Sequence, residues 1–234
     1  MFATELLTFL SEQSEHLFNL VNIAYSVTIE DRLKHSVMAL EALTNVIRNN
    51  TSVEMQSIGH FRLLFSLLNV THSPIQKGAL NVISVVTRNN ECINDIAATE
   101  VLGSLLLVLY TIQDSQPQIL DTLYALMSTT KIVKEALSKG AVIYLLDLFC
   151  NSTNSQVRLT CAELLARMSS DKLVGPKVRL CLGTFLPPIF ADAMRDSPEA
   201  SVNMFESAHE HPELIWDQEA KDRVCTSVAR LRRE

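Results

Sequence analysis

The sequence is short of glycine, of paired cysteines and of long hydrophobic runs. Its six glycines stand alone, so no glycine-rich loop is available to hold a phosphate. No run of about 18 or more apolar residues occurs and the first residues carry no positive charge, so neither a membrane span nor a signal peptide is predicted. We therefore expect a cytoplasmic location. The cysteines lack C-x-x-C spacing, which indicates reduced, buried thiols; they are Cys92, Cys150, Cys161, Cys181 and Cys225.

Basic residues are also in the minority, with 20 Lys and Arg against 26 Asp and Glu and a net charge of −6. This balance argues against nucleic acid as a partner, because phosphate binding needs a concentrated basic face. The basic C-terminus, Arg230, Arg232 and Arg233, has too few charges to hold a protein on an anionic membrane at about 1 kcal/mol each. Direct membrane binding is not expected.

Constellations typical of catalysis or metal binding are missing as well. G-x-S-x-G and H-E-x-x-H do not occur. His209 and His211 flank Glu210, but two histidines at i and i+2 do not share a helix face and no third ligand follows. We predict no catalytic residue, no metal site and no cofactor. An enzyme or nucleotide-binding module is kept only as the least favoured of three classes.

What is present is an internal repeat. Val-Ile-Arg-Asn-Asn at 46–50 returns as Val-Val-Thr-Arg-Asn-Asn at 85–90, so Arg48 and Arg88 are 40 residues apart. The apolar run that follows Gly59 also returns twice at about this spacing. Self-similarity with this period and with helical patterning inside each unit predicts an armadillo or HEAT-type solenoid. With 47% hydrophobic residues, the chain can bury a core and still present apolar surface to a partner.

Apolar spacing, capping residues, glycine and proline divide the chain into short helices. Helix breaks are expected at Gly175-Pro176, Gly183 and Pro187-Pro188. The predicted segments are capping helices at 1–29, repeats at 30–195 and C-terminal helices at 196–234. The predicted helices span about 3–10, 15–25, 30–48, 51–58, 60–70, 74–87, 91–98, 100–112, 117–127, 131–139, 141–149, 156–169 and 198–210.

Two segments resemble the armadillo family in detail. Ala39-Leu-Glu-Ala-Leu-Thr-Asn45-Val is similar to the final helix of an armadillo repeat, and Gly140 to Leu148 is similar to the middle helix. The resemblance covers about 30–182 and implies an all-α, right-handed superhelix of about four three-helix repeats. Members that bind extended peptides use a row of Trp and Asn residues on successive final helices. Asn45 matches the Asn position once, whereas Glu41 stands where the Trp would be.

The C-terminal segment holds the chain's only tryptophan, Trp216, within Pro212-Glu-Leu-Ile-Trp-Asp217. Pro212 and Glu213 suit a helix start, and Val224, Val228 and Leu231 continue an apolar stripe. Trp216 either anchors a terminal helix on the solenoid or is a partner-binding hot spot.

This motif resembles the Pro-Glu-hydrophobic-Ile-Trp-Asn repeat of the large endosomal J-domain proteins of receptor-mediated endocytosis, with Asp217 in place of Asn. The resemblance implies a C-terminal piece of a much larger scaffold, located on early endosomes. It further implies sorting nexins and an actin-nucleating complex as partners, and a heat-shock chaperone recruited through a J domain outside this chain. The expected roles are clathrin-coat dynamics and retromer-linked sorting.

Four residues are candidates for partner binding. Arg48 and Arg88 could form a basic ledge for an acidic peptide or phosphate, or they could serve only the helix C-termini, where cations are favoured by about 0.3–1 kcal/mol. Asn45 and Trp216 complete the set. We expect a non-catalytic interaction scaffold; the alternative is an unrelated cytosolic armadillo adaptor that binds a peptide or a helical partner.

Overall fold

The structure is a computed structural model that describes residues 2–18, 27–50, 52–207, 222 and 226–230. All regular elements in these ranges are helices, and no strand occurs among them. The chain separates into two compact units, residues 1–125 and 126–234, each of which is described by itself. The all-α fold predicted from the sequence is confirmed. The predicted segment boundaries at residues 29 and 195 stay a prediction.

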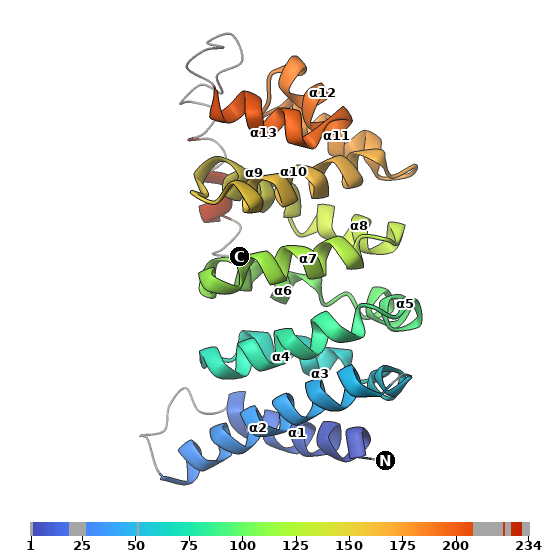
Figure 1. The fold of residues 1–234 in the computed structure, drawn as a ribbon, viewed down its shortest axis with the longest axis vertical. Coiled ribbons are helices and arrows are strands. Elements are labelled where there is room, and N and C mark those ends of the chain that lie inside the picture. The colour runs from blue at the N-terminus through green and yellow to red at the C-terminus, as the bar shows by residue number, and fades with distance from the viewer. Residues whose placement is uncertain (1, 19–26, 51, 208–221, 223–225, 231–234) are drawn as a thin grey trace. The chain divides into compact units, whose positions relative to one another are not determined.

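The first unit is a stack of helices in which the long helices α2 and α4 lie side by side (Figure 1). Helix α1 packs on α2, and the short α3 contacts α4, α5 and α6. A Cβ atom at Gly78 of α4 would lie 3.0 Å from the Leu40 Cβ of α2, so the missing side chain lets the two helices approach closely. The helices are α1 (Phe2–Phe18), α2 (Val27–Asn49), α3 (Phe61–Ser66), α4 (Ser73–Val86), α5 (Asn90–Thr99), α6 (Leu102–Thr111) and α7 (Gln116–Leu126), with 3₁₀ turns η2 (Val53–Ser57), η3 (Leu67–Asn69) and η4 (Gln113–Ser115).

The second copy of the repeated Arg-Asn-Asn motif has a structural role. Asn89 is the N-cap of α5, and its Oδ1 accepts a hydrogen bond from the Glu91 amide at 2.9 Å. The same side chain donates through Nδ2 to Glu54 Oε1 of η2, also at 2.9 Å. One residue therefore begins a helix and joins two successive repeats.

Replacing Asn89 by alanine should lower the free energy of unfolding by about 2 kcal/mol, because the helix cap and a hydrogen bond to a carboxylate are lost together. Urea unfolding followed by circular dichroism measures the change. Asn49→Ala is the matched control, since Asn49 is exposed in the first copy of the phrase, and its effect should stay within about 0.5 kcal/mol. Equal effects for the two substitutions would contradict the role given to Asn89.

In the second unit, α10 is the central helix and packs against α9, α11, α12 and α13. Three phenylalanines from different helices meet beside it: Phe149, Phe190 and Phe205, with ring centroids 5.0–6.5 Å apart in edge-to-face arrangements. The helices are α8 (Thr130–Ser138), α9 (Ala141–Asn151), α10 (Ser155–Ser170), α11 (Gly175–Gly183), α12 (Pro188–Asp196) and α13 (Pro198–Glu206).

Most predicted helix limits agree with the structure to within a few residues. Gly59 and Gly140 adopt φ values of +83° and +79° at predicted helix ends, where a left-handed residue is needed. Pro74 lies in the first turn of α4, and Gly175-Pro176, Gly183 and Pro188 lie at helix limits as expected.

Four local predictions were wrong. The short helix expected at about 51–58 is the 3₁₀ turn η2, which spans Val53–Ser57. Residues 3–10 are not a separate helix, because α1 continues through Ser11–Ser14; the Ser14 hydroxyl donates to the Ser11 carbonyl, so the polar residues are accommodated within the helix. The helix expected at 60–70 ends at Ser66 and continues as the 3₁₀ turn η3. Ser197 precedes α13 as predicted, but its side chain forms no capping hydrogen bond. Thr51, the other predicted cap, lies outside the described residues.

The membrane prediction can be compared only with the described helices. None of them alone has the length and hydropathy of a membrane span. Helices α5 and α6 meet these criteria only when taken together, and the chain bends by 95° between them.

Candidate partner-binding surfaces

The predicted basic ledge falls on the first unit. Arg48 is exposed in the last turn of α2, and Asn45 is exposed one turn earlier on the same helix. Arg88 is exposed in the turn two residues beyond the end of α4. The repeat predicts that both arginines lie at the same place at the end of a long helix. The structure differs, because Arg48 lies within the last turn of its helix and Arg88 lies beyond the end of its own. Neither forms an ion pair with the described part of the chain, so both charges face solvent.

Trp216 lies outside the described residues, as do the rest of the Pro212–Asp217 motif, Val224 and Leu231. Only Val228 of the predicted apolar stripe is described, and its side chain is buried. The anchor and the hot-spot interpretations of Trp216 both stay predictions.

Successive long helices in the first unit are joined by polar side chains. Gln118 Nε2 of α7 donates to Asn81 Oδ1 at 2.9 Å and to Ser84 Oγ at 3.2 Å, both on α4. Lys77 pairs with Asp114, and its hydrogen bond is the main cause of the lowered pKa of that carboxyl. These polar groups bind one another across neighbouring layers of helices. They therefore do not form a row of asparagines that is available to bind a peptide.

His72 precedes α4 as its N-cap, and its Nδ1 accepts a hydrogen bond from the Ile75 amide at 3.4 Å. Only the neutral ring can accept this bond. Partial burial lowers the pKa of His72 below its usual value of 6.5. The folded state therefore binds this proton less readily than the unfolded state does.

His72 should make stability depend on pH in a defined direction. The contribution is complete above the unfolded pKa of about 6.5 and is lost as the pH falls through the lowered folded pKa. We expect His72→Asn, which retains a capping acceptor but does not titrate, to lose less stability than the wild type between about pH 7.5 and about pH 5.5. Thermal unfolding at both pH values tests this, and the remaining histidines are common to both proteins. Identical pH dependence in the two would contradict it.

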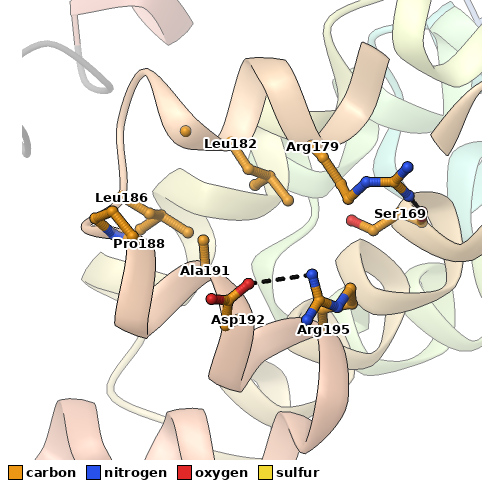
Figure 2. Close-up of a pocket in the computed structure, with 9 residues that line it drawn as sticks. Ser169, Arg179, Leu182, Leu186, Pro188, Ala191, Asp192 and Arg195 are labelled. Carbon is orange, nitrogen blue, oxygen red and sulfur yellow. Dashed lines mark hydrogen bonds and ion pairs between the residues drawn. The ribbon is translucent and has the colours of Figure 1, made fainter. Parts of the chain in front are cut away.

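The second unit carries a hollow of about 190 Å³ between α11 and α12 (Figure 2). Its wall is mainly apolar, formed by Leu182, Leu186, Pro188 and Ala191, with Gly183 contributing no side chain. At the edge, Arg195 is held by two carboxylates: Asp192 lies 3.1 Å from its Nη1 and Asp196 lies 2.7 Å from its Nε. That guanidinium is therefore already neutralised and is not an anion site.

A network of hydrogen bonds fixes the start of α11. Thr130 donates to Asp171 Oδ2 at 2.8 Å, and the amides of Leu173 and Val174 donate to Oδ1 at 2.9 and 2.8 Å. Burial raises the pKa of Asp171, but these hydrogen bonds outweigh it, so the pKa is lowered overall. Arg179 donates to the Ser169 carbonyl at the end of α10, where a cation is favourable (Figure 2). The surface around the hollow is thus held by a rigid frame.

Apolar side chains are exposed on this same stretch. The three most exposed large hydrophobic residues in the described part of the chain are Leu173, Leu180 and Ile189, at 77%, 76% and 62%. Sequence reasoning did not identify them, because their spacing is also that of core residues. The available signal was the absence of any acidic residue from 172 to 191, a segment with three cations in a chain of net charge −6.

No arrangement suited to catalysis or metal binding is found among the described side chains. No group of three or more His, Cys, Asp or Glu residues within those ranges is arranged so that it could hold a metal ion. Burial raises the pKa of the Cys92 thiol to about 11 and also raises the pKa values of Cys161 and Cys181. These three thiols are protonated at neutral pH and are therefore poor nucleophiles.

The fold and its surfaces define an all-α protein of stacked short helices. A crystal structure of an engineered protein from the Northeast Structural Genomics Consortium superposes with a TM-score of 0.57 over 94% of this chain and 96% of that one. The two are 17% identical, so this likeness shows the fold alone. No protein-family model matches the chain.

A relative is found among DnaJ-type proteins. In an alignment of 212 residues that covers 85% of this chain, the chain is 32% identical to DnaJ homolog subfamily C GRV2 of Arabidopsis thaliana. The chain is therefore related to a region of a DnaJ subfamily C protein, which confirms the resemblance predicted from Pro212–Asp217. It spans 8% of that relative's length.

Proposed function

We propose that this chain is a non-catalytic, protein-binding segment of a large endosomal J-domain co-chaperone. Its role would lie in endocytic trafficking, clathrin-coat dynamics and retromer-linked sorting on early endosomes. The observation that carries the proposal is the 32% identity to a DnaJ subfamily C protein across 85% of the chain. Because that similarity runs through both units, an unrelated armadillo adaptor is disfavoured.

The physical character of the chain supports a binding role. Stacked short helices expose extended surfaces, and contiguous exposed apolar surface on such a protein marks an interaction site. Partners proposed from the resemblance are sorting nexins and an actin-nucleating complex. A heat-shock chaperone would be recruited through a J domain outside these residues.

The test is to delete residues 1–234 from the full-length gene product in cells and to follow its location and the uptake of a receptor cargo by fluorescence microscopy. We expect the intact protein on early endosomes and a loss of cargo sorting on deletion. A restored wild-type copy is the control. Intact protein that is absent from endosomes, or deletion without any effect on cargo, would overturn the proposal.

A further inference from the structure

The segment from Lys172 to Ala191 combines features that occur together nowhere else among the described residues. It contains the three most exposed large hydrophobic side chains, three cations and no acidic residue. It also supplies most of the wall of the hollow between α11 and α12. We call Lys172, Leu173, Lys177 and Leu180, together with this hollow, the α11 surface.

Two of the exposed apolar side chains lie on or just before α11. Leu173 lies in the turn before this helix and Leu180 lies within it, and each is about three-quarters exposed. Contact of so much apolar surface with water is unfavourable. Leu173 and Leu180 therefore have the character of uncovered binding residues.

The hollow between α11 and α12 can take one apolar side chain. A cavity of about 150 Å³ lined by apolar residues is known to hold benzene, so 190 Å³ is enough for a leucine or phenylalanine side chain. Figure 2 shows Leu182 and Arg179 on one side of the space and Pro188, Ala191 and Asp192 on the other. A buried anchor in such a pocket is the usual centre of an interface.

The charges determine which ligand fits. Asp171 accepts hydrogen bonds from Thr130 and from two amides, and Asp192 pairs with Arg195. Arg179 is committed to the Ser169 carbonyl. Lys172, just before α11, and Lys177, within it, are left as exposed cations. The surface therefore offers positive charge on the α11 side and a neutralised edge at α12.

We propose that the α11 surface binds an acidic, amphipathic segment of a partner protein, which inserts one apolar side chain between α11 and α12 and directs its carboxylates to Lys172 and Lys177. An anionic membrane is less favoured, because two lysines are too few charges to hold a protein on its surface. The inference goes beyond the proposed function and does not need an endosomal location. Peptide binding at the α11 surface could be absent while the trafficking role is correct, and the trafficking role could be wrong while the peptide binds.

The experiment uses the purified 234-residue chain and a phage-displayed library of random peptides. We expect the selected peptides to be enriched in Asp and Glu around a Leu, Phe or Met residue. Binding of a selected synthetic peptide, measured by fluorescence anisotropy, should weaken about tenfold or more in Leu180→Asp. It should weaken several-fold in Lys172→Glu/Lys177→Glu, and this second effect should shrink at high salt.

Two further variants separate the pocket and the charge from general effects. Gly183→Leu should block binding by filling the hollow without changing charge; a Cβ atom at Gly183 meets no atom within 4 Å, so the fold should tolerate it. Lys131→Glu/Lys134→Glu reverses two exposed cations on α8 of the same unit and should leave binding unchanged. Circular dichroism of each variant verifies that it is folded.

Several outcomes would overturn the proposal. Selected peptides without acidic residues, or binding that is unaffected by Leu180→Asp and Gly183→Leu, would place the site elsewhere. Sedimentation showing a dimer that Leu180→Asp dissociates would assign the surface to a second copy of the chain. Flotation with vesicles of phosphatidylcholine and phosphatidylserine that is lost in the lysine variant, without any peptide binding, would assign it to a membrane.

Discussion

Replacing Phe149 by alanine is expected to destabilise the second unit by about 3–5 kcal/mol, the range for removing a large aromatic residue from a core. Phe149 is completely buried, and its ring lies 5.0 Å from Phe205 and 5.9 Å from Phe190. Its removal ends both edge-to-face contacts and leaves a cavity between α9, α12 and α13. Urea unfolding followed by circular dichroism should show the transition of this unit at a lower urea concentration.

The contacts around Phe149 prevent the cavity from collapsing fully, so repacking does not recover the lost stability. Arg158 donates from Nε to the Phe149 carbonyl at 3.2 Å, lies over the Phe205 ring at 5.1 Å and pairs with Glu206 at 2.9 Å. These interactions hold α13 in place over the gap. The matched control is Leu180→Ala, which removes a large apolar side chain that is exposed and should change stability by less than about 0.5 kcal/mol. A similar, small effect of both substitutions would show that Phe149 is not a core residue.

The sequence was sufficient to predict the helices because the local signals agree with one another. Gly59 and Gly140 end helices with positive φ, and Pro74 begins one, as their backbone preferences require. The 40-residue repeat identified equivalent elements without any knowledge of contacts. Where local signals were weak, as at Ser11–Ser14 in α1, the limits were misplaced.

Contacts between helices could not be read from the sequence. Asn89 was visible as part of a repeated phrase, but its bond to Glu54 depends on how two turns 35 residues apart are placed. The meeting of Phe149, Phe190 and Phe205 likewise depends on the packing of three helices around α10. Periodicity identifies apolar positions, whereas the partner of each position is a property of the tertiary structure.

The candidate binding residues also divide into those that the sequence could reveal and those that it could not. Arg48 and Asn45 are exposed on α2, which agrees with the apolar stripe of that helix, but their role in partner binding stays a prediction. Leu173 and Leu180 follow a helical spacing that equally predicts burial, and only the structure shows them exposed. Composition over a whole segment, here the absence of acid from 172 to 191, was the more informative signal.

Replacing Gly175 by alanine should destabilise the second unit by about 3 kcal/mol, although alanine is ordinarily the better helix former. A Cβ atom at this position would lie 2.4 Å from the Ser169 carbonyl oxygen and 3.2 Å from Arg179 Nη1. The first of these is a backbone atom, which cannot move without disturbing the end of α10. The added methyl group would also separate Arg179 from the carbonyl to which it donates.

Gly183 provides the control because it lies in the same helix and receives the same substitution. A Cβ atom at Gly183 meets nothing within 4 Å, so Gly183→Ala should be neutral or stabilising by up to about 1 kcal/mol. Thermal unfolding of the two variants compares a steric effect with helix propensity alone. If both variants were stabilised, the close approach of α11 to the end of α10 would be wrong, and with it the rigid frame on which the α11 surface depends.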